Sequence, residues 1–386
     1  MSDTRHLLLN AILKNFKKFS CYIKLWGFYL TVFKVLGRTA FSPRIFFPSF
    51  RQNILVIGCG QFAYSTLAPR LVRYHLFSPI RYAYDPSDNA LQSFCRAFAC
   101  NGISPLTIKK NLSSAVRIAY ICSDHASHFE YLMQVLEQGV DAYCEKPVTT
   151  TPSQVYQLAE ILGHSKARFY AGYNRPHSPH MARVRAMYGS TMPDTVFLGF
   201  NIYGHFLESD HWYRDKGQGS RIYGNVAHWV DLVIHVLFWQ DVQPDRLDVS
   251  ISYLDDNAVD ENIVVRINDG KSFHAQIGFY CLMEPFTGVH EYLEFATNKF
   301  TARINNFISL EIDTGAGLEL FRTRKKSAGH SQAIRQPMHS AIRPYMEVLL
   351  SELLLGDLHD MVQCRSLSSV FPLGEHRSRL AASLRT

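Results

Sequence analysis

The stretch NILVIGCGQFAYSTLAPRLV, residues 53–72, constrains the fold more than any other part of the chain. An apolar run of strand length leads into Gly58, Gly60 and Ala63 in the spacing GxGxxA, and a helical pattern follows. In such a unit the first glycine makes a tight turn and the second lets backbone amides approach a pyrophosphate. The small third residue lets helix and strand pack closely. The sequence therefore predicts a dinucleotide-binding α/β domain, with the phosphates at the start of the helix.

The ends of the next two strands carry the further candidates for this site. The strand IRYAYD ends in Asp85, 25 positions after Gly60. An acid there can hold both ribose hydroxyls of NAD and would repel a 2′-phosphate, so we expect NAD, with NADP as the alternative. Asp85 is otherwise a turn residue before Pro86. The strand VRIAYIC ends in Ser123-Asp124-His125, a turn that we place beside the nicotinamide, and His128 is expected to open the next helix. Each histidine is either a ligand contact or a structural helix-end residue.

A strand–helix–strand unit then delivers a lysine to the edge of the predicted sheet. Residues 118–122 read as a strand, a helix ends at Gly139, and a strand over Asp141–Cys144 leads into Glu145-Lys146-Pro147. Gly139 stands where a helix needs a left-handed stop. Ligands of open α/β sheets bind at the carboxyl ends of the strands, which is where Lys146 falls. Glu-Lys-Pro is also a common surface turn, but this position favours a catalytic role.

The remaining pattern predicts an α/β Rossmann domain followed by an α+β domain with a large, mostly antiparallel open sheet. A closing strand over Phe169–Gly172 precedes Asn174-Arg175, and eight strand-length patterns follow between residues 195 and 323. We expect a helix from Ile342 to Leu355 that ends at Gly356. The predicted domains are a basic apolar extension and linker, an NAD(P)-binding domain, and a domain for substrate and oligomer contacts: residues 1–51, 52–172 and 173–386.

One helix among the strands carries a polar stripe. In GQGSRIYGNVAHWVDLVIHVLFW, Gly224, His228, Asp231 and His235 stand at i, i+4, i+7 and i+11, on one face of a helix. A histidine on such a stripe is often a satisfied core residue. The alternative is that Asp231, one helical turn after His228, orients the histidine ring. General acid–base chemistry needs this arrangement.

Charge and cysteine usage exclude some classes of function. The net charge is +7, and much of it lies in the first 51 residues, so we expect no nucleic-acid surface across the fold. The eight cysteines form no CxxC or zinc-site pattern, which predicts no metal and a reducing, cytoplasmic compartment. Residues 7–36 are apolar with periodic lysines, and their charge-free run is too short to span a membrane. They are expected to pack on the body or a partner subunit, or to lie on a membrane surface.

The glycine turn, Glu145-Lys146-Pro147, and His228 with Asp231 together resemble the Gfo/Idh/MocA family of nicotinamide-dependent oxidoreductases, over about Asn53 to Lys325. A closer likeness is to the branch often fused behind a zinc-type alcohol dehydrogenase domain. It lies in GYNRPHSP, SDHWYRDKGQGSRIYGNVAHWVD and GVHEYLEFATNKFTARINNF. The expected cofactor-binding residues are Gly58, Gly60, Gln61, Phe62, Ala63, Asp85, Ser123, Asp124, His128, Glu145 and Lys146.

The resemblance implies hydride transfer between nicotinamide and a carbinol carbon of a sugar, cyclitol or nucleotide sugar. His228 is then the general base, Asp231 orients its ring, and Lys146 hydrogen-bonds the reacting oxygen. The resemblance also implies a homo-oligomer. The expected substrate contacts are Asn174, Arg175, Trp212, Tyr223 and Asn225.

Three positions depart from the family pattern. Gly224 stands where many members carry aspartate, Asn225 where the nearer branch carries glutamate, and Pro176 where a second arginine is expected. Two alternatives to an active enzyme therefore remain. One is a cofactor-binding or regulatory protein that has lost turnover, and the other is a membrane-surface scaffold built on the basic extension.

Overall fold

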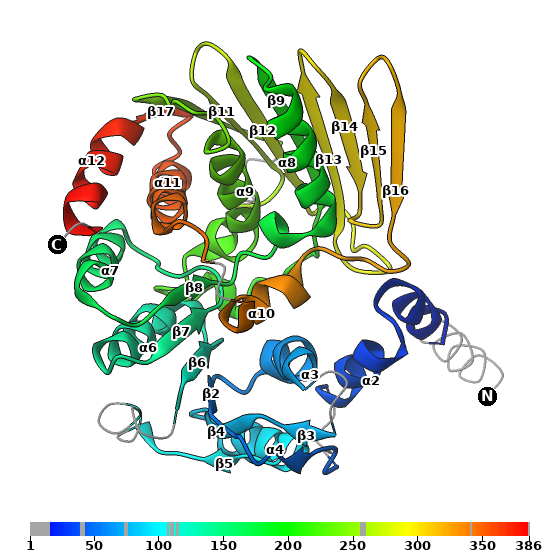
Figure 1. Cartoon of the computed structure of the whole chain (residues 1–386), viewed down its shortest axis with the longest axis vertical. Helices are drawn as coiled ribbons and strands as arrows, with labels where there is room; N and C mark the ends of the chain where they lie inside the picture. The colour runs from blue at the N-terminus through cyan, green and yellow to red at the C-terminus, as the bar shows by residue number, and fades with distance from the viewer. Residues whose placement is uncertain are drawn as a thin grey trace.

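The computed structural model describes residues 16–38, 43–72, 76–105, 108, 112, 116–254, 260–339 and 342–384. The predictions for residues 1–15 and 39–42 of the extension lie outside this part. Two sheets form the body of the molecule, and helix α10 (His330–His339) lies between them (Figure 1). The predicted fold class is confirmed, whereas the division at residues 52–172 and 173–386 stays a prediction.

The first sheet is six-stranded and parallel, in the order β5-β4-β2-β6-β7-β8. This is the strand order of a doubly wound dinucleotide-binding fold, in which strands are added first on one side of β2 and then on its other side. Short apolar runs form the buried strands, and β7 has the predicted bounds. The strands are β2 (Ile54–Ile57), β4 (Ile80–Tyr84), β5 (Asn101–Gly102), β6 (Ile118–Ile121), β7 (Asp141–Cys144) and β8 (Phe169–Ala171).

The helices of this domain follow the local signals in the sequence. Gly139 has the expected left-handed backbone, with φ of 70°, and the Thr151 side chain accepts the N–H of Gln154 at the start of α7. Helix α6 begins at His125 and not at His128, so that prediction was wrong by one turn. The helices are a π-helical turn η1 (Ala63–Leu67), α3 (Ala68–Leu71), α4 (Asp88–Phe98), α6 (His125–Glu137) and α7 (Pro152–His164).

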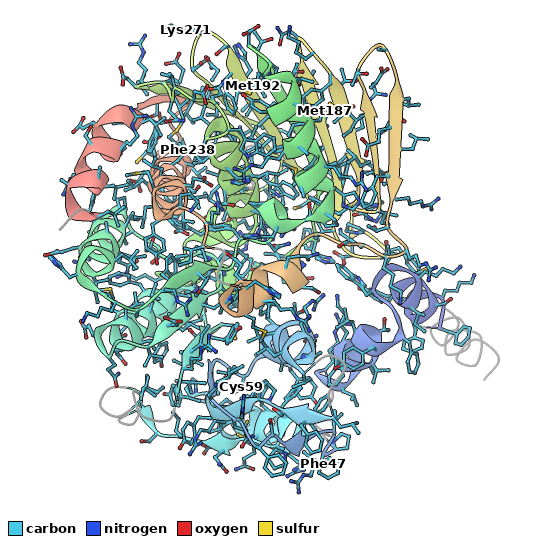
Figure 2. All side chains as sticks on the ribbon, in the orientation of Figure 1. Phe47, Cys59, Met187, Met192, Phe238 and Lys271 are labelled. Atoms are coloured by element: carbon cyan, nitrogen blue, oxygen red, sulfur yellow. The ribbon has the colours of Figure 1, made fainter. Side chains whose placement is uncertain are left out.

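The second sheet has nine strands in the order β16-β15-β14-β13-β9-β12-β11-β10-β17. All neighbours are antiparallel except β9 and β12. Its first eight strands match the predicted patterns, and Lys271 marks the tip of one hairpin (Figure 2). The strands are β9 (Val196–Tyr203), β10 (Leu247–Tyr253), β11 (Ile263–Asn268), β12 (Phe273–Tyr280), β13 (His290–Thr297), β14 (Thr301–Asn305), β15 (Ser309–Asp313), β16 (Leu318–Arg322) and β17 (Ser368–Phe371).

Helices cover one face of this sheet, and the main hydrophobic core lies between them and the strands (Figure 1). The expected end of a helix at Gly356 was wrong, because α11 runs through it. A Cβ at Gly356 would lie 2.9 Å from the Pro152 ring, so glycine allows α11 to pack closely against α7. The helices are η2 (Arg175–His177), α8 (Pro179–Thr191), η3 (Trp212–Arg214), η4 (Ile222–Val226), α9 (Ala227–Leu237), α11 (Tyr345–Gln363) and α12 (Leu373–Leu384).

The described part of the extension packs on the first domain. Residues 16–26 are helical, Gly27 interrupts them, and α2 (Phe28–Leu36) follows. Phe33 of α2 stacks on Phe46 and Phe98, with ring centroids 6.0 and 5.9 Å apart, and α2 lies against η1. A short parallel pair, β1 (Phe47–Pro48) and β3 (Phe77–Ser78), continues the contact. Among the described residues, no helix is both long and apolar enough to cross a membrane.

Candidate active site

The glycine turn after β2 has the form that the fingerprint predicts. Gly58 has φ of 88°, and a Cβ there would lie 2.5 Å from the Cys122 carbonyl oxygen. An added Cβ at Gly60 would meet no atom within 4 Å, because it points into open space at the start of the helix. Backbone N–H groups at a helix start favour anions, so this open cradle fits a pyrophosphate. Ala63 is fully buried and lets η1 pack on the sheet.

A cavity of about 860 Å³ lies over this turn. Asp85 lines it, while its carboxylate accepts the N–H groups of Cys59 at 2.7 Å and Ser87 at 2.8 Å. The residue therefore braces two turns and also faces the space where a ribose would lie. We call this space the cofactor cavity. The predicted cofactor-binding residues that line it are Gly58, Gly60, Gln61, Phe62, Asp85, Ser123 and Asp124.

A second cavity, of about 320 Å³, adjoins the first and holds most of the predicted catalytic and substrate residues. We call it the reaction cavity. It shares Phe62, Cys122, Ser123 and Trp212 with the cofactor cavity. The predicted residues that line it are His128, Glu145, Lys146, Asn174, Arg175, Trp212, Asn225 and His228.

Lys146 enters the reaction cavity from the turn after β7, and its ammonium donates a hydrogen bond to the Gly224 carbonyl. Burial lowers the pKa of Lys146 to about 8, and the attraction of Glu145 opposes that shift. The Glu145 carboxylate is buried beside it and accepts the Tyr143 hydroxyl at 2.7 Å. Lys146 is therefore a cation that gives up its proton more readily than a surface lysine.

His228 reaches the same cavity from α9. Its Nδ1 is buried and has no hydrogen-bond partner among the described residues. Burial lowers its pKa well below the ordinary value, and the nearby charges of Arg175 and Lys146 act in the same direction. The ring is therefore neutral at pH 7. It can accept a proton only when another group stabilises the charge of the buried imidazolium.

The structure contradicts the predicted pairing of Asp231 with His228. Both Asp231 carboxylate oxygens bind the Arg343 guanidinium, at 2.7 and 2.8 Å, and Arg343 also binds Glu347 at 2.7 Å. Helix α9 rises about 1.5 Å per residue, so Asp231 lies one turn farther from the cavity than His228. Asp231 is fully buried and holds α9 to the start of α11.

Tyr223 is not a stacking surface for a ligand, contrary to the prediction. It is a buried residue of η4, and its ring centroid lies 5.6 Å from that of His359 of α11. Tyr213, which was not among the predicted site residues, lines the reaction cavity together with the predicted Trp212. A Cβ at Gly224 would lie 2.4 Å from the Tyr213 ring, so the glycine at this position admits the tyrosine.

The two histidines of the earlier strand end are held by backbone groups. His125 Nδ1 lies 2.9 Å from the Gln218 carbonyl oxygen. The ring nitrogens of His128 lie 2.7 Å from the Pro147 carbonyl oxygen and 3.1 Å from that of Ser123. Both rings line the reaction cavity, and His128 joins the Lys146 turn to the Ser123 turn.

Arg175 belongs to a buried charge network that sequence reasoning missed. Its guanidinium binds Glu291 of β13 and donates to the Asn174 side chain at 2.7 Å. Lys326 binds the other Glu291 oxygen at 2.7 Å. Strand alternation places Glu291 on the buried face with Leu293, and a carboxylate in that position needs charged or polar partners. The alternation of side chains along this strand could therefore have shown from the sequence that Glu291 is buried.

Glu352 of α11 in the second domain supports the turn that carries Lys146. Its carboxylate accepts the N–H groups of Val148 at 2.9 Å and Thr149 at 3.1 Å, and the Tyr173 hydroxyl at 2.6 Å. It lies within the apolar run YMEVLLSELLL, again a buried carboxylate. The turn that carries Lys146 is thus fixed by His128 and Glu352 together. Among the described residues, no group of three His, Cys, Asp or Glu side chains is placed to hold a metal.

Comparison with known proteins agrees with this geometry. Residues 52–173 match the Gfo/Idh/MocA family, described as an oxidoreductase family with an NAD-binding Rossmann fold. No curated protein matches the chain.

Solved structures extend the likeness over both domains. A dehydrogenase from Chromobacterium violaceum is 15% identical, with a TM-score of 0.66 over 84% of this chain and 97% of its own. A 3-ketoreductase from Actinomadura kijaniata, solved with NADP and TDP-benzene, is 15% identical, with a TM-score of 0.63 over 81% and 97%. GenD2 from gentamicin A biosynthesis, solved with NAD, is 16% identical, with a TM-score of 0.64 over 86% and 99%. Residues 52–173 therefore match the NAD-binding Rossmann domain of the Gfo/Idh/MocA oxidoreductase family, and the chain has a two-domain fold that the solved structures share.

Proposed function

We propose that the chain is an NAD(P)-dependent oxidoreductase that transfers hydride between nicotinamide and a carbinol carbon of a sugar, cyclitol or nucleotide sugar. One observation carries the proposal. Lys146, His228 and Asn174 line one reaction cavity that shares its wall with the cofactor cavity. The TDP-benzene bound by the similar 3-ketoreductase supports a nucleotide-linked substrate. The likeness to the branch fused to a zinc-type alcohol dehydrogenase domain remains a prediction.

The proposed chemistry follows from the protonation states of two side chains. Bound nicotinamide supplies the hydride acceptor or donor. Removal of a hydride from an alcohol also requires removal of the hydroxyl proton. The neutral His228 imidazole accepts that proton, and the Lys146 ammonium hydrogen-bonds the same oxygen and stabilises its developing charge. With a pKa of about 8, Lys146 can also release its own proton to solvent and, as a neutral amine, accept the proton that leaves the substrate hydroxyl.

The substrate contacts follow from the other walls of the reaction cavity. Asn225 offers an amide, and Trp212 offers an aromatic face shared by both cavities. Asn174 also lines the reaction cavity, but its amide already binds Arg175 and the Ala328 carbonyl. Arg175 is already bound to Glu291, so it offers less free charge to a substrate than an isolated arginine would. These side chains suit hydroxyl groups of a sugar-like ring, with NAD preferred because Asp85 faces the cofactor cavity.

Two steps test the proposal. Purified protein is first titrated with NADH and NADPH by fluorescence quenching, and tighter binding of NADH is expected. Nucleotide sugars are then screened for turnover, and Lys146→Ala and His228→Ala are each expected to lower kcat at least about 100-fold. The matched control is Lys166→Ala, an exposed lysine of the same domain. Full turnover by either site variant, or a folded protein that binds neither cofactor, would refute the proposal.

A second candidate is a cofactor-binding or regulatory protein without turnover. It is favoured by the His228 Nδ1, which has no hydrogen-bond partner in the part of the chain that the structure describes, since Asp231 binds Arg343. It predicts that NADH binds tightly while no nucleotide sugar changes the nicotinamide absorbance.

We also propose that the chain forms a homo-oligomer through the sheet face that helices leave open. That face of the nine-stranded sheet carries the exposed side chains of Phe197, Tyr203 and Tyr292. Rings on adjacent strands lie together there, with the centroids of Tyr203 and Tyr292 6.0 Å apart. An apolar patch of this kind on one sheet face is typical of a protein–protein contact.

A further inference from the structure

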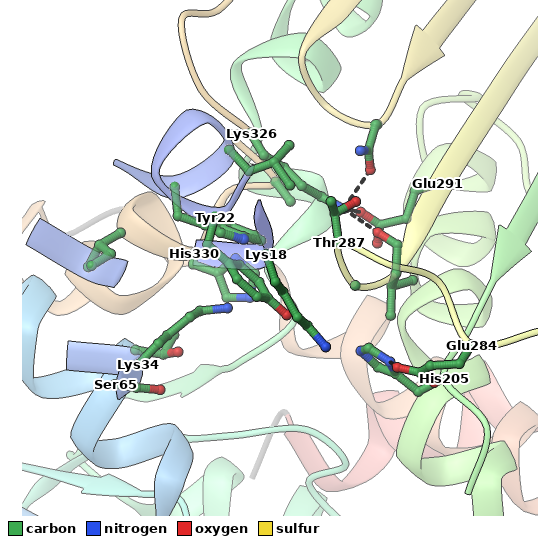
Figure 3. Close-up of a pocket in the computed structure, with 18 of the residues that line it drawn as sticks. Lys18, Tyr22, Lys34, Ser65, His205, Glu284, Thr287, Glu291, Lys326 and His330 are labelled. Atoms are coloured by element: carbon green, nitrogen blue, oxygen red, sulfur yellow. Dashed lines mark hydrogen bonds and ion pairs between the residues drawn. The ribbon is translucent and has the colours of Figure 1, made fainter. Parts of the chain in front are cut away.

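A third cavity, of about 710 Å³, lies between the N-terminal segment, residues 16–38, and the two domains (Figure 3). We call it the basic cavity. It shares Arg175, Val289 and His330 with the reaction cavity. It also shares Lys34, Arg38, Ser65 and Thr66 with the cofactor cavity. The N-terminal segment therefore forms one wall of a space that adjoins both parts of the active site.

The walls of the basic cavity carry an excess of positive charge. Six cationic and three carboxylate side chains line it: Lys18, Lys34, Arg38, Arg70, Arg175 and Lys326, against Glu208, Glu284 and Glu291. Glu284 lies at one side, 2.7 Å from His205, and Glu291 already binds two of the cations. Within the described residues, neither Lys34 nor Arg38 forms an ion pair with an acid.

Lys34 shows most clearly that this charge is uncompensated. Its ammonium lies 5.4 and 4.6 Å from the ring centroids of Tyr22 and Trp26, so aromatic faces are its neighbours. Burial, together with the nearby charges of Arg70, Arg38 and Lys326, lowers the pKa of Lys34 to about 8. Arg70 and Lys34 are also among the cations that depress the pKa of His330. An anion in this cavity would relieve repulsion that the protein alone leaves in place.

The size and lining of the cavity narrow the class of anion. Its volume falls within the roughly 300–1,000 Å³ typical of small-molecule sites, well above the needs of a single phosphate. Tyr22, Trp26 and Phe206 line it and offer aromatic faces on which a nucleobase can stack. Lysine and arginine side chains around such a space suit phosphate oxygens. The chemistry is therefore that of a nucleoside diphosphate group.

We propose that the basic cavity binds the diphosphate of a nucleotide-linked substrate, and that the N-terminal segment is part of the substrate site. Lys34 and Arg38 contact the phosphates, and the sugar-like group extends past Arg175 into the reaction cavity. The placement of the reacting carbon rests on the proposed function, whereas the phosphate site stands on the cavity itself. Figure 3 shows Lys18 and Lys34 directed into this space, which accounts for lysines that otherwise favoured a membrane surface.

The first test measures binding of inorganic pyrophosphate to the full chain by isothermal titration calorimetry, with and without saturating NADH. Because NADH fills the glycine turn, binding that persists in its presence belongs to the basic cavity and is the expected result. Pyrophosphate that binds only without NADH would show that these cations serve the cofactor, and would overturn the proposal. No binding in either state would overturn it as well.

Substitutions then locate the site. Lys34→Gln and Arg38→Gln are each expected to weaken pyrophosphate binding to the NADH-bound protein roughly tenfold or more, since each removes a charged contact. Lys24→Gln, an exposed lysine on the same segment, should stay within about twofold of wild type. Arg38 is exposed, so Arg38→Gln should fold normally. It can therefore still be measured if Lys34→Gln lowers the yield of folded protein. Wild-type affinity in both site variants would overturn the proposal.

The two proposals can fail separately. Suppose that the protein binds NADH and turns over substrate, but that Lys34→Gln and Arg38→Gln leave its pyrophosphate affinity unchanged. The proposed function then stands, and the proposal of a phosphate site in the basic cavity fails. Suppose instead that the protein binds no NADH, so that the proposed function fails. If Lys34→Gln then weakens pyrophosphate binding and Gly60→Val does not, the phosphate site in the basic cavity is still supported.

Discussion

Glu291 offers the sharpest test of the charge network behind the active site. Burial acts to raise the pKa of Glu291, but Arg175 and Lys326 hold it at about 2, compared with 4.5 for an ordinary glutamate. That difference corresponds to about 3 kcal/mol of stabilisation of the charged form at neutral pH. Burial lowers the pKa of Lys326, because one shared carboxylate does not offset its own loss of solvent. Glu291, which has two cations beside it, is therefore the residue whose charged form the network stabilises.

We expect Glu291→Gln to lower the free energy of unfolding by about 3–4 kcal/mol at neutral pH, since it leaves two buried cations without their anion. Urea denaturation followed by tryptophan fluorescence measures this loss. Trp212, Trp229 and Trp239 of the second domain report it, and the Arg175 guanidinium lies 5.1 Å from the Trp229 ring. The matched control is Glu294→Gln on the same strand, whose exposed carboxylate lies 3.5 Å from Arg303 and should contribute under about 1 kcal/mol.

The pH dependence adds an independent check. Because the pKa of Glu291 is lower in the folded chain, its contribution is fully present above pH 4.5 and is lost as the pH falls toward 2. Each pH unit below 4.5 should remove about 1.4 kcal/mol of the difference between wild type and Glu291→Gln. A Glu291→Gln protein as stable as Glu294→Gln, or a difference that does not change between pH 7 and pH 3.5, would refute the reasoning.

Other predictions concern the cofactor turn and the open sheet face. Gly60→Val should weaken NADH binding roughly tenfold or more with little loss of stability, since its side chain would enter open space where a phosphate lies. Gly58→Ala should instead cost about 1–3 kcal/mol of stability, because its φ of 88° is strained for alanine; thermal denaturation with and without NADH separates the two. Asp85→Asn should reduce the preference for NADH over NADPH roughly tenfold in fluorescence titrations, and an unchanged preference would leave Asp85 a turn residue. Tyr292→Lys should convert an oligomer into monomers in analytical ultracentrifugation, and a monomeric wild-type protein would end that prediction.

Local patterns in the sequence predicted the parts of the fold that local physics controls. The strand Asp141–Cys144, the left-handed Gly139 and the open cradle at Gly60 follow from short-range signals and are confirmed. The rule that ligands bind at the carboxyl ends of parallel strands also brought Lys146 and Asn174 to one cavity. The catalytic and binding roles of these residues remain predictions.

The errors came where a residue's partner lies far away in the chain. The helical stripe placed Asp231 on the face of His228, but the arginine that binds it is 112 positions later. Tyr223 is aromatic and near Gly224, yet periodicity alone does not tell which side of a helix start faces a ligand. Glu291 was missed because a strand pattern shows that a carboxylate is buried without naming its cations.

The contacts of Glu352 bear on how this protein can be divided. Residues 52–172 contain the whole parallel sheet and the glycine turn, so they invite expression as a separate fragment. Such a fragment would lack Glu352, and the N–H groups of Val148 and Thr149, buried in the intact chain, would lose their acceptor. The loop that presents Lys146 is thus completed by a side chain about 200 residues downstream, as the separation of 204 positions from Val148 shows. A fragment that still binds NADH would therefore be a poor guide to the proposed chemistry of the intact chain, because its lysine would no longer be held in place.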